Sequence, residues 1–361
     1  MPTIAHAPPT ASSRLTIEPA DRFSDAVDVS AVWNRAFATR DDRRFETYFS
    51  NSSEVGEILV ARLDDGRAVG ALGIHARQMQ LGRAVWTVGQ IGNLGVLPEF
   101  RSVGPAVQLV KSALGRFSER NAAVVFGATR LAEAVLQRAG LRVLGDAERW
   151  CKPIRTERRM AAGLGLPALA NAASVLVDCV LEWRSREHFT SMPAGFYVER
   201  IAAFDDRFDR LWNRGRGQFG VTLQRTQCDL SWRFGSCATR QHEILGLLDR
   251  SGELRGYLIY RIDGEVLNVM DLFCDAGENI GLLLSSLLRF IRVGEPSVQT
   301  VSLECFGSDW LRQRLPAFGF RRRPNRCRVL LADNSGQAEL STEHLVRCRA
   351  NWFLTGGDAD F

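Results

Sequence analysis

The chain has 361 residues, 45% of them hydrophobic, which is enough for two domains of ordinary size with buried cores. Its formal net charge is +5, but the basic residues are almost all arginine and are scattered, which argues against a nucleic-acid partner. The eight cysteines contain no Cys-x-x-Cys pair, which argues against a metal site or a disulfide framework and favours a cytoplasmic location.

The first part of the chain predicts a strand, a helix and a hairpin. Residues 1–14 have no charged segment followed by an apolar core, so no signal peptide is expected. Residues 15–18 predict a strand, and residues 25–37 predict a helix that buries its apolar side. Strands at 58–63 and 68–79 flank an Asp-Asp-Gly-Arg turn, whose Asp-Gly pair favours a tight hairpin.

The stretch 85–97 is apolar, but Gly89, Gly92 and Gly95 interrupt it at every third position. A glycine inside a strand marks a bulge or a close backbone approach, so we expect a bulged strand. The alternative is that these glycines only let a helix pack closely. Pro98 has no N–H to donate to a neighbouring strand and should end the pairing.

The turn after this strand, residues 101–106, reads Arg-Ser-Val-Gly-Pro-Ala and leads into a helix. N–H groups at a helix N-terminus lack intrahelical partners, and the helix dipole adds positive potential, so this turn predicts a phosphate or pyrophosphate site. Pro105 supplies no N–H, so other residues of the loop must donate. The alternative is an ordinary strand-to-helix corner with proline in the first turn. The helix is expected to bury Val107, Val110, Leu114 and Phe117.

Two further elements and a last strand complete the first unit. Residues 122–126 read as a buried central strand, and residues 131–139 as a helix that Gly140 ends. The order is then strand, helix, three strands, helix, strand, helix, strand. We therefore assign residues 1–153 to a first domain.

Residues 154–190 form a connecting segment of different composition. Residues 161–181 are almost all small and apolar, but Pro167, Asn171 and Asp178 lie among them. A charge at the centre of a membrane helix costs about 3 kcal/mol, so we expect no transmembrane segment and one or two helices packed between domains. A weak contact of residues 161–181 with a membrane surface is the alternative.

The second half of the chain, residues 191–361, repeats the pattern of the first. Such a shared period indicates a duplicated unit and therefore two like domains in tandem. The second copy has no Arg-x-x-Gly-x-Ala loop, so the anion site is expected in the first domain only. Glu57 matches Glu243 and Gly66 matches Gly252 at one offset, and Trp33 matches Trp212 after a shift of a few residues.

The element order, with the motif Arg-x-x-Gly-x-Ala filled by Arg101, Gly104 and Ala106, resembles the GNAT superfamily of acyl-CoA-dependent N-acyltransferases. The whole organisation is similar to two-domain GNAT proteins that are predicted acyltransferases of bacterial surface-polysaccharide synthesis. The resemblance implies an α/β fold of the α+β kind. It implies two tandem GNAT-like domains, each a mixed, largely antiparallel twisted sheet flanked by helices. It covers nearly the whole chain, although only the loop is a specific motif.

The resemblance also implies which residues meet the co-substrate. The pantetheine arm of acetyl-CoA, or of another acyl-CoA, would lie where the glycine-rich strand splays from its neighbour. A backbone N–H there would polarise the thioester carbonyl. The pyrophosphate would lie on the loop. The cofactor-binding residues expected on this basis are Leu94, Val96, Arg101, Ser102, Val103, Gly104 and Ala106.

The proton carriers are less well defined by the sequence. Many members of the superfamily place a tyrosine four residues before the glycine that ends the last helix, but Leu136 and Leu315 stand at these positions. A carboxylate or imidazole acting through water could serve as the base. Asp271, at the end of a strand, fits a capping or turn role equally well. The candidate catalytic residues are Asn93, Glu46 and Asp271, with His75 as a further base.

The sequence therefore predicts an acyl-CoA-dependent N-acyltransferase. The expected reaction is acetyl transfer to the amine of an amino sugar or another small amine, by direct attack on the thioester. A Fem-like transferase that takes its acyl group from aminoacyl-tRNA is one alternative, although a tRNA user should show a more basic face. A non-catalytic CoA-binding or scaffold protein is the other.

Overall fold

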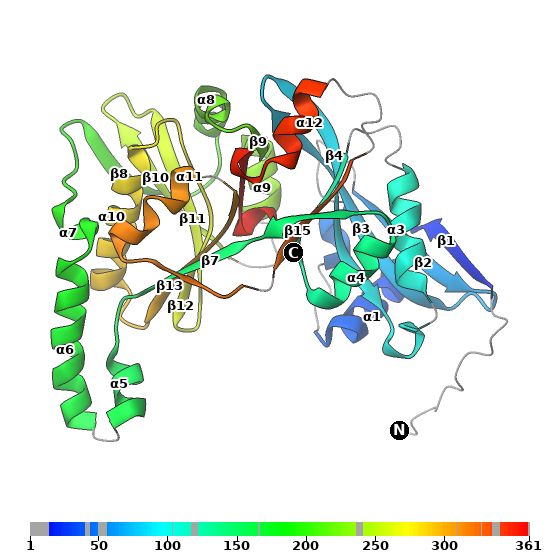
Figure 1. The fold of residues 1–361 in the computed structure, drawn as a ribbon, viewed down its shortest axis with the longest axis horizontal. Coiled ribbons are helices and arrows are strands. Elements are labelled where there is room, and N and C mark those ends of the chain that lie inside the picture. Colours follow the sequence, from blue (N-terminus) through cyan, green and yellow to red (C-terminus); the bar gives the residue numbers. More distant parts are fainter. Residues whose placement is uncertain are drawn as a thin grey trace.

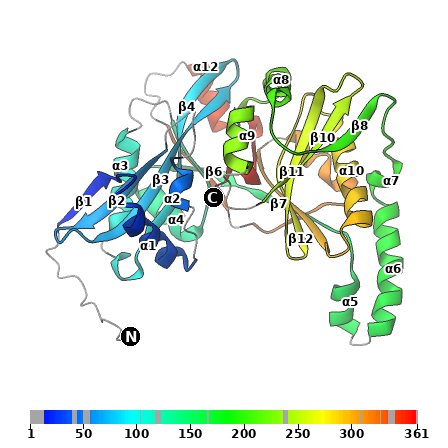
Figure 2. The same cartoon turned by 180° about the vertical axis from the view of Figure 1, so that it is seen from behind.

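The computed structural model shows two halves side by side, joined by one sheet (Figure 1). The first half lies on the right of Figure 1 in blue and cyan, and the second lies on the left in green, yellow and orange. A pair of helices, α5 (Glu157–Leu164) and α6 (Pro167–Trp183), stands away from the second half in both views (Figure 2). The structure describes residues 14–39, 44–49, 56–102, 104–116, 122–164, 167–235, 241–307, 309–325, 327–333 and 340–359.

The first half has the predicted order of elements, with two additions: a short helix before the hairpin and a second strand after the last helix. Its first helix buries Val29, Val32 and Trp33 against the sheet, and Gly66 forms the turn of the predicted hairpin with a φ of 82°. The elements are β1 (Leu15–Pro19), α1 (Ala26–Phe37), α2 (Arg44–Thr47), β2 (Glu57–Leu63), β3 (Ala68–Leu81), β4 (Ala84–Val96), α3 (Pro105–Arg116), β5 (Ala122–Ala128), α4 (Arg130–Arg138), β6 (Arg142–Asp146) and β7 (Glu148–Pro153).

The second half follows the same order after the connecting helices α5, α6 and α7 (Arg186–Phe189). Trp212 is buried in its first long helix as Trp33 is in α1. The elements are β8 (Phe196–Ile201), α8 (Asp206–Gly215), β9 (Val221–Leu223), α9 (Gln227–Phe234), β10 (Glu243–Asp249), β11 (Leu254–Asp263), β12 (Val266–Cys274), α10 (Asn279–Gly294), β13 (Thr300–Gly307), α11 (Asp309–Arg312), β14 (Arg321–Arg323), β15 (Arg328–Asp333), α12 (Leu340–Arg347) and β16 (Trp352–Thr355).

Each half contributes one strand to the sheet of the other. Strand β7, from the first half, pairs antiparallel with β13 and β14. Strand β15, from the second half, lies between β5 and β6 and pairs antiparallel with both. A boundary at residue 153 follows the chain, but a cut there would remove β7 from the strands to which it is hydrogen-bonded. Strand pairing links residues far apart in sequence, so the local pattern did not reveal this exchange.

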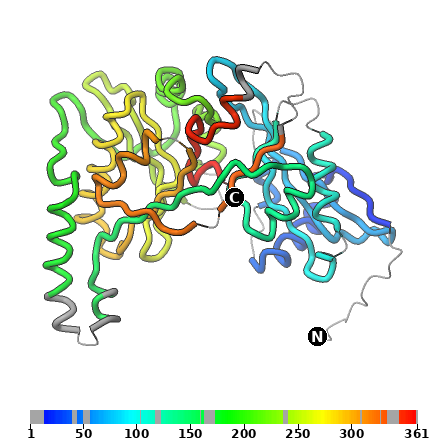
Figure 3. The backbone as a smooth tube through the Cα atoms, in the orientation of Figure 1, coloured from blue at the N-terminus to red at the C-terminus, as the bar shows by residue number. Residues whose placement is uncertain are grey.

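A second connection joins the halves through short strands. Strand β9 pairs with the end of β3 on one side and runs parallel to β16 on the other, and β16 pairs with β13. The tube in Figure 3 shows the red C-terminal segment returning to the junction between the halves. Fully buried side chains fill this junction, among them Met79, Leu223 and Trp352. The apolar core therefore continues from one half to the other.

The helix α3 packs on a different side from the one its sequence predicts. The buried residues are Leu109, Val110 and Ala113, whereas Val107 and Leu114 are only half-buried. Phe117 lies outside the described residues. The prediction is confirmed for Val110, but the centre of the buried side is rotated from the predicted one, because apolar residues occur on neighbouring stripes of this helix and contact with β3 selects one of them.

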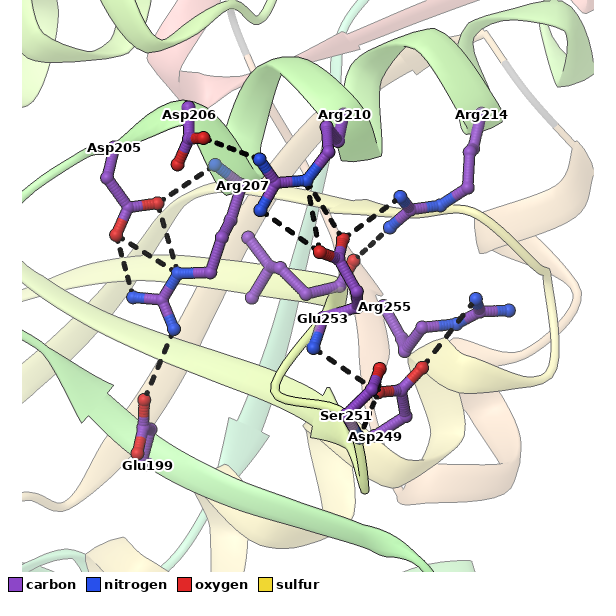
Figure 4. Close-up of polar contacts among 11 residues, drawn as sticks. Glu199, Asp205, Asp206, Arg207, Arg210, Arg214, Asp249, Ser251, Glu253 and Arg255 are labelled. Carbon is purple, nitrogen blue, oxygen red and sulfur yellow. Dashed lines mark hydrogen bonds and ion pairs between the residues drawn. The ribbon is translucent and has the colours of Figure 1, made fainter.

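Ion pairs link α8 to the β10–β11 hairpin of the second half (Figure 4). Asp205 caps the helix by accepting from the backbone N–H of Arg207, and Arg210 and Arg214 both reach Glu253 on the hairpin. Surface ion pairs of this kind each contribute little because water screens them. The position of α8 therefore depends mainly on its buried side chains, Phe208, Leu211 and Trp212.

Candidate functional site

The pairing of β3 with β4 is interrupted at one place. Gly73 pairs with Gly92, but the next pairs leave Asn93 and Leu94 of β4 opposite a single residue of β3. Asn93 has a φ of 48°, in the left-handed region that asparagine tolerates better than most residues. The glycine-rich strand therefore contains the bulge that its sequence predicts.

Strands β4 and β5 separate just before the bulge. They run parallel and pair from Val88 to Gln90 on β4 and from Ala122 to Val124 on β5. Among the described residues no pairing continues beyond these positions, and a cavity of about 200 Å³ opens between the strands. Its lining consists of Phe37, Arg44, Ile91, Gly92, Asn93, Leu94, Val125, Phe126, Gly127, Ala128, Thr129, Ala132 and Leu136.

The loop after β4 leads from the bulge to the N-terminus of α3. Gly104 has a φ of 93°, a conformation that side chains with a Cβ adopt at a cost of roughly 1–2 kcal/mol. Arg101 is turned back into the protein, where its side chain donates to the carbonyl oxygens of Val96 (3.3 Å) and Ala36 (3.1 Å). Arg101 therefore fixes the loop, and the backbone N–H groups near the start of α3 remain the donors for an anion.

The other residues expected to bind the cofactor are spread over this region. Leu94 lines the cavity, whereas Val96 is buried and pairs with β3. Ser102 is exposed on the loop, and Ala106 is half-buried in the first turn of α3. Val103 lies outside the described residues.

A stack of side chains connects the bulge to the second half. The Nδ2 of Asn93 donates to the Oη of Tyr48 at 2.8 Å. The Tyr48 ring stacks on His75 with centroids 4.0 Å apart and planes 8° apart. Trp232 of α9 meets His75 edge-on at 4.6 Å, and its Nε1 donates to the carbonyl of Thr47 at 3.1 Å. The second half thus reaches the bulge through a buried tryptophan.

One family model matches the region that contains this cavity. Residues 22–141, from just before α1 to just after α4, match the family model described as an acetyltransferase (GNAT) domain. The chain contains a GNAT acetyltransferase domain. The matched region includes the bulge, the loop and every residue that lines the cavity. No protein with a curated description matches the chain significantly in sequence.

Solved structures resemble the chain over both halves. A probable N-acyltransferase from Enterococcus faecalis V583 is 14% identical, with 89% of this chain and 72% of that one covered and a TM-score of 0.62. A GCN5-related N-acetyltransferase from Anabaena variabilis ATCC 29413 is 17% identical, with 89% and 73% covered and a TM-score of 0.63. The N-myristoyltransferase of Saccharomyces cerevisiae, solved with myristoyl-CoA, is 12% identical, with 91% and 82% covered and a TM-score of 0.58. At these identities the likeness is one of fold.

The structure places Asn93 at the cavity of the GNAT domain, but not Glu46. Glu46 is exposed and forms an ion pair with Arg22 at 3.3 Å. The described lining contains three polar side chains, those of Arg44, Asn93 and Thr129, and no carboxylate. Leu136, which stands where many members of the superfamily have a tyrosine, is buried in the cavity wall. Among the described residues no group of three His, Cys, Asp or Glu side chains could hold a metal ion.

Asp271 is buried within the second half and away from the lining. Its carboxylate accepts from Arg225 Nε at 3.2 Å, from Tyr257 Oη at 2.7 Å and from Thr355 Oγ1 at 2.7 Å. Burial raises the pKa of Asp271 above its usual value, although the Arg225 guanidinium opposes the change. None of these partners lines the cavity, so the position of Asp271 argues against its role as the base of the GNAT domain and indicates a structural one.

The second half closes the gap that corresponds to the cavity. Strands β12 and β13 also pair in parallel only as far as Val269 and Leu303. Beyond that point β16 pairs with β13, and a Cβ at Gly357 would lie 3.0 Å from the carbonyl oxygen of Met270 on β12. The chain's own C-terminal segment thus fills the space that stays open between β4 and β5. The sequence pattern showed that the second half lacks the Arg-x-x-Gly-x-Ala loop, but it did not show that the C-terminal segment lies between β12 and β13.

The same C-terminal segment then approaches the open cavity. Gln90 Nε2 donates to the carbonyl of Asp358 at 2.9 Å, and Arg233 Nη2 donates to that of Ala359 at 2.8 Å. A Cβ at Gly127, which lines the cavity, would come within 3.5 Å of the Cβ of Ala359. Residues of the second half therefore form part of the surroundings of the first-half site.

The buried His75 gives the fold a pH dependence. Burial lowers the pKa of His75 well below its usual value, and Arg233 and Arg77 lower it further. The unfolded chain then binds a proton that the fold excludes, so stability is complete above about pH 6.5 and is lost as the pH falls below it. We expect the free energy of unfolding at pH 5.5 to be about 1.4 kcal/mol lower than at pH 7.5 from this group. Urea titrations should show this slope, and His75→Phe should flatten it. A slope that His75→Phe leaves unchanged would assign the effect to other groups.

The conformation of Asn93 predicts a difference between two substitutions. Both Asn93→Ala and Asn93→Gly remove the hydrogen bond to Tyr48, but only alanine is strained at a φ of 48°. We expect Asn93→Ala to be less stable than Asn93→Gly by about 1 kcal/mol in urea unfolding, because glycine relieves the strain at some entropic cost. Equal stability of the two variants would show that the left-handed backbone is not maintained.

Proposed function

We propose that the chain is an acyl-CoA-dependent N-acyltransferase whose co-substrate lies between β4 and β5. The separation of these strands at the bulge carries the proposal, because it leaves a cavity beside the strand that leads into the loop before α3. We assign the pantetheine to this cavity beside Leu94. We assign the pyrophosphate to the loop formed by Arg101, Ser102, Gly104 and Ala106, with Pro105 giving no hydrogen bond.

The proposed reaction is direct transfer. The acceptor amine attacks the thioester carbonyl carbon, the N–C bond forms, the C–S bond breaks, and CoA leaves as the thiol. The backbone N–H of Leu94, at the bulge, would stabilise the developing oxyanion. The described lining contains no carboxylate or phenol, so we assign both proton transfers to water: one takes the proton of the amine and one protonates the departing sulfur. Asn93 would position the bulge rather than carry a proton.

We propose a short acyl group and a small amine, such as an amino sugar. A cavity of about 200 Å³ that also holds the pantetheine favours acetyl over a long chain, because typical pockets for larger ligands start at roughly 300 Å³. We further propose two tandem GNAT-like units, residues 1–153 and 191–361, joined by 154–190 and exchanging β7 and β15. Trp232 and the C-terminal segment of the second unit would form one side of the site in the first unit.

Thermal unfolding with and without acetyl-CoA tests the binding step. Ligand at 100 times its dissociation constant should stabilise the chain by about 2.7 kcal/mol. An unchanged unfolding temperature with millimolar acetyl-CoA, and with longer acyl-CoAs, would contradict the proposal. Pantetheine serves as a control, because it lacks the pyrophosphate and should stabilise the chain less.

Release of the CoA thiol with a panel of amino sugars tests turnover. Thiol release that depends on one amine would support transfer and identify the acceptor. Stabilisation by acetyl-CoA without thiol release on any amine would favour a CoA-binding scaffold. Stabilisation by aminoacyl-tRNA but not by CoA would favour the Fem-like alternative.

A further inference from the structure

The outward side of α6 is an uninterrupted apolar surface. Val175, Leu176, Val180 and Trp183 are 52% to 71% exposed, and the exposed Cys179 lies among them. At about 100° per residue these five positions fall within about 140° of the helix circumference, so they form one stripe. We call this set the α6 stripe. A monomeric protein rarely exposes such a continuous apolar side, which marks it as a contact surface.

Both acidic side chains in the described part of α6 have partners outside the stripe. Asp178 accepts from the Oγ1 of Thr156 at 2.8 Å, at the base of the helix pair. Glu182 forms an ion pair with Arg292 of α10 at 3.8 Å. Asp178 is thus held on the side that faces the protein, whereas Glu182 lies at the edge of the stripe with its charge paired to Arg292. The five residues of the stripe themselves carry no negative charge.

Cations flank the end of the stripe. Arg184 and Arg186 follow Trp183 directly, and both are exposed. Within the described part of the chain neither side chain has an ion-pair or hydrogen-bond partner. An apolar stripe that ends in tryptophan next to unpaired arginines matches the boundary between lipid chains and anionic headgroups, where tryptophan is enriched and cations gain energy.

The dimensions of α6 favour a helix that lies on the membrane rather than across it. Its 17 residues span about 25 Å, shorter than the roughly 30 Å hydrocarbon layer. Within the part of the chain that the structure describes, no helix is long and apolar enough to cross a membrane.

A second copy of the chain fits the stripe less well than a membrane does, because a stable protein interface needs about 20 to 30 residues from each partner and the stripe offers five.

We propose that α6 is an interfacial helix that holds this protein on a membrane surface rich in anionic lipid. The helix pair stands clear of both sheets in Figures 1 and 2, so the stripe can reach a surface without a change in the GNAT domain. The apolar side chains would enter the boundary between headgroups and chains, and Arg184 and Arg186 would contact lipid phosphates. This proposal is independent of the proposed reaction.

Co-sedimentation of the full chain with vesicles tests the proposal. Binding is expected to vesicles of equal phosphatidylcholine and phosphatidylglycerol, and it should weaken strongly with phosphatidylcholine alone. R184Q/R186Q should weaken binding about 30-fold, because two charges are lost. L176S/V180S should weaken it about 100-fold or more, because two apolar side chains no longer enter the lipid.

Val293→Ser provides the matched control. Val293 is 89% exposed on α10, and its substitution should leave vesicle binding unchanged. All variants should keep the unfolding temperature of the wild-type chain because the replaced side chains are exposed. Lack of binding to anionic vesicles, or binding that L176S/V180S leaves intact, overturns the proposal. A dimer in solution that L176S/V180S converts to monomer also overturns it, because a second copy would then cover the stripe.

Discussion

Replacement of Arg225 by methionine is expected to lower the free energy of unfolding by about 3–5 kcal/mol. The Arg225 guanidinium is 2% exposed, lies 3.2 Å from Asp271 and 2.6 Å from Asp358, and also donates to Thr222 Oγ1 at 2.7 Å. Methionine fills a similar volume but leaves two buried carboxylates without their cation. Breaking one side of a buried ionic cluster is costly because the remaining charges stay desolvated. Urea unfolding at pH 7.5 measures the loss.

The pH dependence of the loss distinguishes charge from packing. Without Arg225, burial should raise the pKa of Asp271 further above its usual value. A carboxyl whose folded pKa is raised stabilises the fold at low pH and loses this contribution as the pH rises through that pKa. The deficit of Arg225→Met relative to wild type should therefore be smaller at pH 5 than at pH 7.5. Arg210→Met, which removes an exposed ion-paired arginine, should show no measurable deficit at either pH. A deficit independent of pH would indicate that lost packing dominates.

Replacement of Ala132 by phenylalanine is expected to abolish stabilisation by acetyl-CoA. Ala132 lies on α4, is half-buried and lines the cavity between β4 and β5. A phenyl ring there would occupy much of the space of about 200 Å³ that we assign to the pantetheine. Stabilisation of about 2.7 kcal/mol at 100 times the dissociation constant should fall to about 0.4 kcal/mol if affinity drops 100-fold, and toward zero if it drops further. Thermal unfolding with acetyl-CoA measures this.

A neighbour on the same helix supplies the control. Leu131 is 82% exposed and does not line the cavity, so Leu131→Phe should bind acetyl-CoA like the wild-type chain. The unfolding temperature of Ala132→Phe without ligand should stay near that of wild type, which separates a blocked cavity from a damaged fold. If Ala132→Phe is still stabilised by acetyl-CoA to the wild-type extent, the co-substrate does not lie between β4 and β5.

The sequence identified features that depend on neighbouring residues in the chain. The Asp-Gly turn, the order of elements and the bulge follow from local backbone preferences, which glycine and proline set strongly. The sequence left two interpretations of the β4 glycines open, a bulged strand and close packing of a helix, and the structure shows one glycine of each kind. Gly92 lines the cavity at the bulge, whereas a Cβ at Gly95 would lie 2.8 Å from Trp33 and would prevent α1 from packing closely.

The sequence predicted a site at β4 and its loop, where the structure has a cavity, but it did not predict the groups around that cavity. Asn93 reaches the cavity because it lies on the bulge. Glu46 and Asp271 do not, since one faces solvent and the other joins an ion-paired cluster in the second half. A carboxylate has the same chemistry in either place. Its use depends on which charges the fold brings next to it, and these lie far away in the sequence.

By itself, therefore, the sequence determined the local elements and the turn that leads into α3, and it predicted their repetition. Only the tertiary structure decided that β7 and β15 each join the sheet of the other half. It also decided that β16 fills the space beyond the pairing of β12 with β13, and that Trp232 supports the bulge through His75. The physical reason is that an apolar strand or a tryptophan signals burial without specifying its partner. The partner is selected by backbone pairing and shape complementarity between segments that lie far apart in the sequence.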